Sequence, residues 1–321
     1  MRAIRYHQQG GPEVLQMDEL PDPTPSQGEA LVAIEASGVN PHEVSRRAGI
    51  AGPPLDGPLI PGIEAAGVVV ETGAGVTSVK AGDRVIVRQP AYSYAELIAV
   101  PQEMLYHIPD ALGTVEAATI AIAFTTAWHG LVVQARAQKG ETVLVQAAAS
   151  GVGIAAIQLG KLLGLNVIGT ASTAEKLDWA KGYGLDHGIN YAETDFVQEA
   201  RQLTNGQGVD IIVDGVGGEV LTKGIGALTR EGRIAVFGGA GGRTVEISLP
   251  TLFGGGGKSI LGTYGGATTR ADFEQILGWL AEGKLRTTVD RTWPLEEAAE
   301  AHKYQSSRQI KGKSALIVKK G

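Results

Sequence analysis

Apolar positions follow two patterns along the chain, and the change near residue 124 predicts two kinds of domain. Before it, short apolar runs at 31–37, 63–71, 84–89 and 95–100 are separated by turn-rich segments such as PDPTPSQG and AGPPLDGPLIPG. Short Val- and Ile-rich runs bounded by Pro and Gly are typical of strands. We therefore predict a compact, irregular β domain over residues 1–123.

Beyond residue 124, apolar runs alternate regularly with helical patterns. These runs carry no alternating polar residues, which is typical of strands covered by helices on both faces. Repeated strand–helix units with short loops predict an α/β fold with a doubly wound parallel sheet, over residues 124–265. The predicted strands are 142–146, 166–170, 186–190, 209–214 and 232–237, and the predicted helices are 151–163, 175–182, 195–203 and 219–228.

The last part of the chain is predicted to pack back onto the first domain. A strand at 259–263 closes the α/β part, and helices at 270–282 and 296–304 and a strand at 314–318 follow it. We assign residues 266–321 to the first domain. The segment GGGGKS (254–259) is no P-loop, because that motif requires Gly at the position of Leu252.

Composition and charge remove several classes of function. The chain has no Cys, which excludes disulfides, thiolate nucleophiles and Cys-containing zinc sites. Its net charge is −6 without a basic cluster, which disfavours nucleic-acid binding. The beginning, MRAIRYHQQGGPEVLQ, lacks the apolar core of a secretory signal, so we expect a cytoplasmic protein. The apolar stretch 143–160 contains two Gln and several Gly, which favours a strand, a turn and a buried helix over a membrane span.

A phosphate-binding turn is predicted in ETVLVQAAASGVGIAAIQLGKLLGLNVIGTAS (141–172), where a small-residue turn joins a strand to a helix. In the G-x-G-x-x-G register, Ala148, Ser150 and Gly153 hold the three glycine positions. They must provide a tight turn, access for a pyrophosphate and close helix packing. The pyrophosphate would lie at the N-terminus of the helix that begins at Gly151. Simple close packing of a strand, a turn and a helix is the alternative.

The end of the next strand predicts NADPH as the cofactor in preference to NADH. An NAD site places an acid about 20 residues beyond the first Gly, where it binds the ribose 2′-hydroxyl. Here the strand ends in Gly169-Thr170-Ala171-Ser172, and Lys176 follows. Hydroxyls and an ammonium suit a 2′-phosphate. Glu175 leaves open that Lys176 makes only a surface ion pair. Two further glycine segments, DGVGG (214–218) and VFGGAGG (236–242), end strands and are predicted to line the nicotinamide end; a simple turn is the alternative for each.

Seven motifs follow one another along the chain: EASGVNPHEVSRRAG, PGIEAAGVVVETGAGV, GDRV, QAAASGVGIAAIQLGK, GTASTAEK, INY and GKSALIV. In this order they resemble the medium-chain dehydrogenase/reductase superfamily, and within it the zinc-free quinone oxidoreductase (zeta-crystallin-like) family. The resemblance covers essentially the whole chain. It implies a GroES-like catalytic domain built from both ends of the chain around a Rossmann domain. It also implies a homodimer formed through the sheet edge near 259–264.

The resemblance also bears on zinc. Zinc alcohol dehydrogenases of this superfamily carry Cys and His ligands where this chain has Asn40 and Ile63. With no Cys and six His, no ligand set for a metal is apparent, and Glu64 is expected to support the fold. Reduction would then rest on hydride transfer from nicotinamide C4 and on hydrogen bonds to the oxygen that gains charge. Quinones and activated α,β-unsaturated carbonyls suit such a site.

Site residues follow from the resemblance, residue by residue. Asn40 is implied to lie near the nicotinamide and Thr126 near the nicotinamide or its ribose, and Ser45 stands where family members often have Tyr. These three are the catalytic candidates. The lost phenol at Ser45 keeps open a non-catalytic NADPH-binding protein, beside an enoyl or alkenal double-bond reductase. The implied cofactor-binding residues are Asn40, Pro41, Thr126, Ala149, Ser150, Gly151, Val152, Thr170, Ser172, Lys176, Tyr191, Gly215, Val216, Phe237, Gly238, Gly239 and Ala240.

No residue stands out in the sequence as a general acid. His129, Tyr92, Tyr94, Arg46 and Arg47 are candidate proton donors. Each has a simpler interpretation, as a half-buried helix histidine, a strand aromatic or a solvated arginine. Water is an equal source of the proton.

Overall fold

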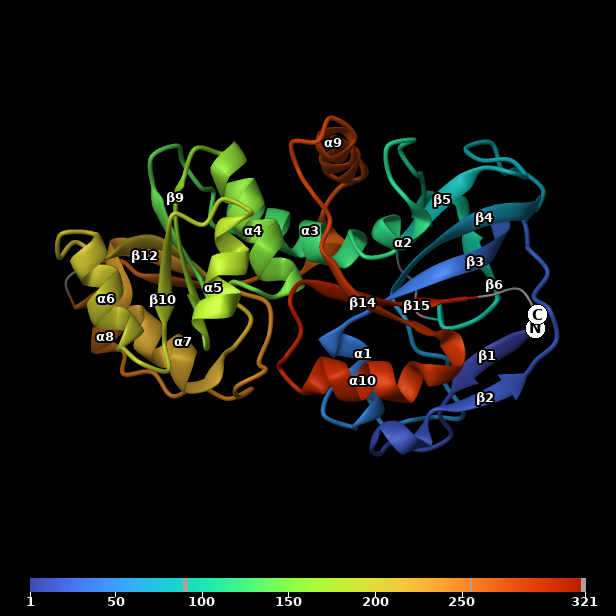
Figure 1. The fold of residues 1–321 in the computed structure, drawn as a ribbon, viewed down its shortest axis with the longest axis horizontal. Helices are drawn as coiled ribbons and strands as arrows, with labels where there is room; N and C mark the ends of the chain where they lie inside the picture. Colours follow the sequence, from blue (N-terminus) through green and yellow to red (C-terminus); the bar gives the residue numbers. More distant parts are fainter. Residues whose placement is uncertain (89–91, 255, 319–321) are drawn as a thin grey trace. The chain divides into compact units, whose positions relative to one another are not determined.

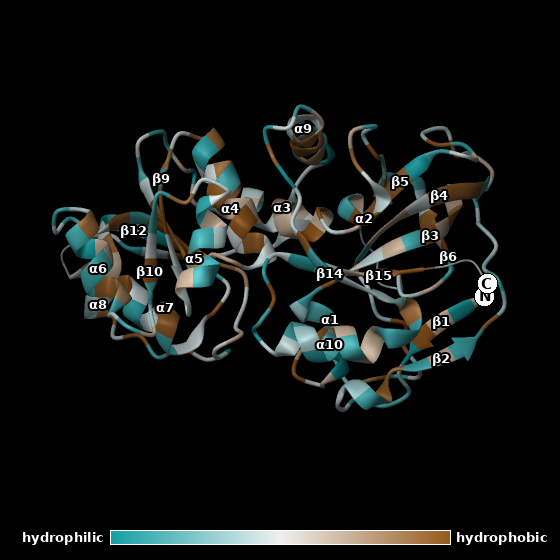
Figure 2. Cartoon of the chain, in the orientation of Figure 1, coloured by the Kyte–Doolittle hydropathy of each residue, from teal (hydrophilic) through white to brown (hydrophobic). Residues whose placement is uncertain are grey.

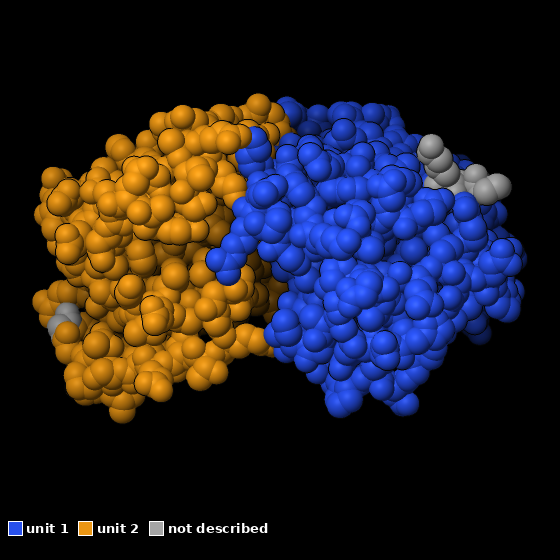
Figure 3. All heavy atoms as spheres, turned by 60° about the horizontal axis from the view of Figure 1, so that its bottom comes forward, with its two compact units in different colours: residues 1–122, 273–283, 287–321 blue, residues 123–272, 284–286 orange. Residues whose placement is uncertain are grey.

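The computed structural model describes residues 1–88, 92–254 and 256–318, which form two compact units (Figure 3). Unit 1 comprises Met1–Ile122, Phe273–Gly283 and Thr287–Gly321, and unit 2 comprises Ala123–Asp272 and Lys284–Arg286. The chain therefore begins in unit 1, builds unit 2 and returns to unit 1.

Unit 1 is built on a sheet in which the two ends of the chain pair. Strand β15 (Lys313–Ile317) is antiparallel to β3 (Glu29–Val39), with Leu316 opposite Ser37 (Figure 1). The sheet order is β14-β15-β3-β4-β5-β7, and β6 also pairs with β3. The remaining strands are β4 (Glu64–Thr72), β5 (Arg84–Arg88), β6 (Leu97–Pro101), β7 (Leu105–His107) and β14 (Val289–Pro294), with β1 (Arg2–Arg5) and β2 (Gln16–Glu19) forming a separate pair.

Helices of unit 1 pack on this sheet around an apolar core that includes Val32, Val85 and Leu316. Figure 2 shows apolar residues along β4 and β5 and hydrophilic residues along α10. Helix α1 begins directly after β3, because Asn40 has extended backbone angles and Pro41 occupies the first helical position. The helices are α1 (Pro41–Arg47), α2 (Thr114–Ala117), α9 (Arg270–Ala281), α10 (Ala298–Ser306), η1 (Pro12–Val14), η2 (Gln102–Met104) and η6 (Leu295–Glu297).

Unit 2 is a parallel sheet in the order β10-β9-β8-β11-β12-β13. Val143, Leu144 and Val145 are consecutive and fully buried, so both faces of β8 are covered. The predicted doubly wound sheet is confirmed. Its strands are β8 (Thr142–Val145), β9 (Asn166–Ala171), β10 (His187–Asn190), β11 (Val209–Asp214), β12 (Leu228–Val236) and β13 (Ser259–Gly262). Its helices are α3 (Ala121–Trp128), η3 (His129–Gln134), α4 (Gly151–Leu162), α5 (Ala174–Lys181), α6 (Phe196–Leu203), α7 (Gly218–Gly224), η4 (Ile225–Ala227), α8 (Pro250–Phe253) and η5 (Gly265–Ala267).

Most predicted elements are found within a few residues of their expected bounds. The helix predicted at 219–228 is wrong at its end: α7 stops at Gly224, and Leu228 already pairs with Val209 in the sheet. The predicted strand 84–89 ends at Arg88, and residue 89 lies outside the described residues. The apolar stretch 143–160 forms β8 and most of α4, as predicted. No helix in the described parts of the chain has the length and apolar character to cross a membrane.

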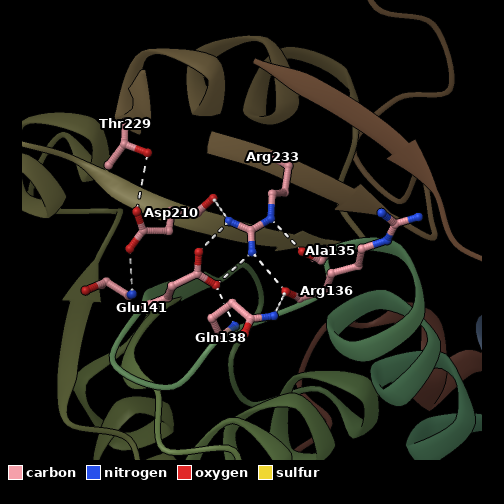
Figure 4. Close-up of polar contacts among 8 residues, drawn as sticks. Ala135, Arg136, Gln138, Glu141, Asp210, Thr229 and Arg233 are labelled. Carbon is pink, nitrogen blue, oxygen red and sulfur yellow. Dashed lines mark hydrogen bonds and ion pairs between the residues drawn. The ribbon is translucent and has the colours of Figure 1, made fainter. Parts of the chain in front are cut away.

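Arg233 on β12 fixes the segment that leads into β8 (Figure 4). Its guanidinium donates to the carbonyl of Ala135 at 2.6 Å and to both carboxylate oxygens of Glu141 at 2.8 and 2.7 Å. Burial raises the pKa of Glu141, but the hydrogen bonds from Arg233 and the Gln138 amide outweigh it, so that the pKa is lowered. Glu141 therefore stays ionised and anchors a segment without regular structure at the start of the sheet.

His302 on α10 lies in a buried polar chain in unit 1. Arg47 Nε donates to its Nδ1 at 3.3 Å, so the ring proton is assigned to Nε2, which lies 3.2 Å from the Tyr94 hydroxyl. The prediction of solvated arginines is wrong for Arg47, which is 3% exposed and also donates to the Gly10 carbonyl. Burial, with the charge of Arg47, lowers the pKa of His302 to about 3.

The buried His302 predicts a loss of stability in acid. Its pKa is lower in the folded than in the unfolded chain, so its contribution is complete above the unfolded value of about 6.5 and is lost as the pH falls toward about 3. Within that window we expect the free energy of unfolding to fall by about 1.4 kcal/mol per pH unit from this group. Urea unfolding at several pH values, with wild type and His302→Gln, measures the difference. If the free energies of unfolding of wild type and His302→Gln changed with pH in the same way, the prediction would be wrong.

Candidate cofactor and active site

The turn between β8 and α4 has the local structure of an anion site. Ser150 is the N-cap of α4, with φ −78°, and its hydroxyl accepts a hydrogen bond from the Gly153 amide at 3.0 Å. Serine therefore satisfies one of the exposed amides at the helix start. The Gly151 and Val152 amides have no partner within the helix, and the helix dipole favours negative charge there. These amides, which follow the buried Ala149, suit a pyrophosphate.

Close packing at the turn explains its small residues. A Cβ on Gly153 would lie 2.5 Å from the Ala147 carbonyl oxygen and 2.7 Å from that of Ala148. The tight turn was expected at Ala148, but the left-handed conformation occurs one residue earlier, at Ala147, with φ +51°. The turn thus forms without a first glycine, at the expense of local backbone strain.

Hydroxyl and cationic residues gather where β9 ends. Ser172 follows β9 directly, and Lys176 lies in the first turn of α5, where its amide donates to the N-cap Thr173. The Tyr191 amide donates to the Ala171 carbonyl at 3.1 Å, which brings the half-exposed Tyr191 to the same place. The Thr170 hydroxyl is instead buried and donates to Gln146 Oε1 at 2.6 Å. The end of β9 can therefore offer a phenol, a hydroxyl and an ammonium to an anion.

The two glycine segments beyond β11 and β12 form one structure. The Phe237 amide donates to the Asp214 carbonyl at 2.9 Å, and the Ala240 amide to the Gly215 carbonyl at 3.3 Å. A Cβ on Gly238 would lie 2.6 Å from the Gly215 carbonyl oxygen. Asp214 Oδ1 also accepts from the Val216 amide at 2.6 Å. Gly215, Val216 and Phe237 through Ala240, with Gly239 among them, therefore share one end of the sheet.

Thr126 lies at the same end of the unit 2 sheet as these glycine segments. A Cβ on Gly265 would approach the Thr126 hydroxyl to 2.7 Å, and Gly265 follows the end of β13. The candidates of unit 2 thus lie at or near the carboxyl ends of its strands. Ligands of doubly wound sheets bind at this edge, near the point where the strand order reverses, which here is between β8 and β11.

Asn40, Pro41 and Ser45 belong to unit 1, on or next to α1. Asn40 is 3% exposed; its Nδ2 donates to Glu43 Oε1 at 3.1 Å, and its Oδ1 accepts from Lys313 Nζ. Ser45 lies half-buried within α1, and its carbonyl accepts from the Ile50 amide. The amide of Asn40 is therefore held from both sides, by Glu43 and Lys313.

Lys313 and Glu64 form a buried ion pair. Lys313 Nζ lies 2.7 Å from Glu64 Oε1, and Glu64 Oε2 accepts from the Ile122 amide at 2.9 Å. Glu64 is fully buried, which gives it the supporting role expected from the sequence. Lys313 was missed; the signal available was a single charged residue at the start of an otherwise apolar strand pattern.

The proton-donor candidates have structural surroundings of different kinds. Tyr94 is fully buried beside His302, and burial raises its pKa. His129 is also buried, which lowers its pKa, and its Nδ1 accepts from the Tyr264 amide at 3.3 Å. Arg46 donates to the Pro53 carbonyl, whereas Tyr92 is 49% exposed. None of these contacts selects one of them as an acid.

Comparisons with known proteins match both units. The family models described as alcohol dehydrogenase GroES-like domain and zinc-binding dehydrogenase match residues 26–110 and 151–282. The chain is 34% identical to a 2-haloacrylate reductase from Burkholderia sp., over 98% of each chain. It is 32% identical to human quinone oxidoreductase, over 94% of this chain and 93% of the relative.

A solved structure gives the same result. The crystal structure of Escherichia coli quinone oxidoreductase complexed with NADPH superposes with a TM-score of 0.91 at 31% identity, covering 99% of this chain and 100% of the other. The fold agrees with the expected pairing of a Rossmann domain and a GroES-like domain. The chain therefore belongs to the medium-chain dehydrogenase/reductase superfamily, in its zinc-free quinone oxidoreductase family.

Proposed function

We propose that the protein is an NADPH-dependent oxidoreductase that reduces quinones or other activated α,β-unsaturated carbonyls. The observation that carries the proposal is the end of β9, where Ser172, Lys176 and Tyr191 gather and no acid occupies the strand end. The helix start at Gly151 supplies amides for the pyrophosphate of the same cofactor. The names of the relatives, a quinone oxidoreductase and a 2-haloacrylate reductase, are in keeping with acceptors of this class.

Each group of residues has a distinct part in this proposal. Bound NADPH supplies a hydride from its nicotinamide ring. The Gly151 and Val152 amides hold the pyrophosphate, and Lys176 with its neighbours holds the 2′-phosphate. Asn40 offers an amide N–H to the oxygen that gains negative charge, which stabilises the transition state. Delocalised acceptors need little further stabilisation, because their rings or conjugated bonds share the charge.

The direct test is oxidation of NADPH, and of NADH in parallel, in the presence of quinones, enones, enoyl thioesters and simple ketones. The enzyme is treated with EDTA beforehand. Turnover of quinones or enones with NADPH, unchanged by chelation, supports the proposal. Preference for enoyl thioesters would favour a double-bond reductase. NADPH binding without turnover of any acceptor would favour a non-catalytic NADPH-binding protein.

Lys176→Ala tests the cofactor assignment. We expect it to weaken NADPH binding by about 1.5–3 kcal/mol, the scale of a hydrogen bond to a charged group, and to leave NADH binding nearly unchanged. Titration of each cofactor by fluorescence measures both effects. The matched control is Lys181→Ala on the same helix, because Lys181 pairs with the exposed Asp178 instead. Equal losses for NADPH and NADH would show that Lys176 does not meet the 2′-phosphate.

We further propose a cytoplasmic homodimer joined through β13. This strand lies at the edge of the unit 2 sheet. An edge strand presents unpaired backbone groups that a second copy can cover. Sedimentation is the test, and a species with only the 33.4 kDa mass of one chain would exclude the dimer.

A further inference from the structure

A buried polar network surrounds Asn40 in unit 1. Asn40, Glu43, Glu64 and Lys313 are 3%, 2%, 0% and 6% exposed. They come from three elements: Asn40 and Glu43 from the start of α1, Glu64 from β4 and Lys313 from β15. Buried charges require partners, so the hydrogen bonds of this network determine its charge.

Lys313 and Glu64 satisfy one another. The three N–H bonds of the Lys313 ammonium are directed to the Val39 carbonyl at 3.2 Å, to Asn40 Oδ1 and to Glu64 Oε1. The second oxygen of Glu64 is taken by the Ile122 amide. The pair is therefore neutral as a whole, and Lys313 has no N–H left for another carboxylate.

Glu43 is the additional acid in this network. Its Oε1 accepts from Asn40 Nδ2, whereas its buried Oε2 has no hydrogen-bond partner among the described residues. The charges of Lys313 on β15 and Glu64 on β4 act on the pKa of Glu43. Tyr94, which is hydrogen-bonded to His302 of α10, also faces Glu43, whose charge contributes to the raised pKa of Tyr94. Burial raises the pKa of Glu43 to about 7, although the hydrogen bond from Asn40 and the charge of Lys313 oppose it.

We propose that Glu43 is a positioning residue for Asn40, and that the proton on its carboxyl keeps the Asn40 amide in one orientation. Lys313 holds the oxygen of this amide and Glu43 holds one N–H, so the amide cannot rotate and its second N–H remains for the substrate. When Glu43 loses its proton to solvent, its carboxylate becomes a stronger acceptor for Asn40 Nδ2 and draws the amide out of the orientation that Lys313 and the neutral carboxyl hold. This inference rests on the proposed function, which gives Asn40 its contact with the substrate oxygen.

The kinetic test compares pH profiles of kcat/KM with NADPH and p-benzoquinone. For wild type we expect a fall of about tenfold across a midpoint near neutral pH, as one group ionises. Glu43→Gln keeps an oxygen toward Asn40 and cannot ionise, so the inflection should disappear. Glu43→Ala should lower kcat at every pH without changing KM for NADPH. The matched control is Glu35→Gln on the exposed side of β3, which should retain the wild-type profile.

The positioning itself is followed by NMR of the Asn40 side-chain amide, assigned with Asn40→Asp. In wild type its resonances should move with the same midpoint as the kinetics, and in Glu43→Gln they should not move. An amide that titrates in a protein without turnover would support the inference and overturn the proposed function. An inflection or a moving resonance that persists in Glu43→Gln would overturn the inference, as would a wild-type amide that does not titrate.

Discussion

Lys313→Met is expected to destabilise the protein by about 3–5 kcal/mol, the scale for breaking a buried ion pair by removing one partner. The substitution keeps an apolar side chain of similar length but leaves the fully buried Glu64 carboxylate without its cation, 2.7 Å away in the wild type. It also removes the donor to Asn40 Oδ1. Urea unfolding followed by circular dichroism measures the change.

A matched control and a rescue separate charge from volume. Lys303→Met, on α10, removes an exposed lysine from its pair with the equally exposed Glu300 and should change stability by less than about 1 kcal/mol. The double variant Lys313→Met/Glu64→Gln no longer buries an unpaired charge and should recover most of the loss. If Lys313→Met were as stable as Lys303→Met, the buried charge of Glu64 would not depend on Lys313, and the prediction would be wrong.

Gly153→Ala is expected to destabilise the protein by about 1–3 kcal/mol and to weaken NADPH binding at least tenfold, because the turn must shift. The added Cβ would meet the Ala147 and Ala148 carbonyl oxygens at 2.5 and 2.7 Å. These are backbone atoms, so no side chain can move aside. Any shift also displaces the Gly151 amide, on which the proposed pyrophosphate contact depends. Thermal unfolding and a cofactor titration measure the two effects.

Gly278→Ala is the control for loss of a glycine as such. Gly278 lies within α9, and a Cβ there meets nothing within 4 Å. Helix propensity alone should then make this variant about 0.5–1 kcal/mol more stable. If Gly153→Ala behaved like Gly278→Ala, close packing would not be the reason for glycine in the turn.

The sheet of unit 2 could be predicted because its pattern is local. Each strand is a continuous apolar run such as Val143–Val145, and each helix repeats its apolar face within one or two turns. In contrast, β14 was not predicted, because in VDRTWP only Trp293 is buried. The end of α7 was also missed, since the register of β12 with β11, and not helix propensity, decides where Leu228 lies.

The candidate residues of unit 2 could be predicted for a related reason. Residues that end parallel strands meet at one edge, so sequence position already suggests which of them are neighbours. The network around Asn40 has no such rule. Lys313 and Glu64 are 249 residues apart in sequence. The pKa of Glu43 is raised by burial, which is provided by elements distant in sequence. Nothing in the sequence near Glu43 distinguishes it from a solvated carboxylate at a helix start.

The position of β15 also has a consequence for biosynthesis. A ribosome completes Ala123–Asp272, most of unit 2, before it makes residues 313–317. During that time residues 36–39 of β3 lack β15, the strand that pairs with them, although β4 and β6 already pair with β3, and Glu64 lacks its cation. The parallel sheet of unit 2 can thus form before the sheet of unit 1 is complete. The strand made late in translation both joins β14 to β3 and supplies the cation for the buried Glu64.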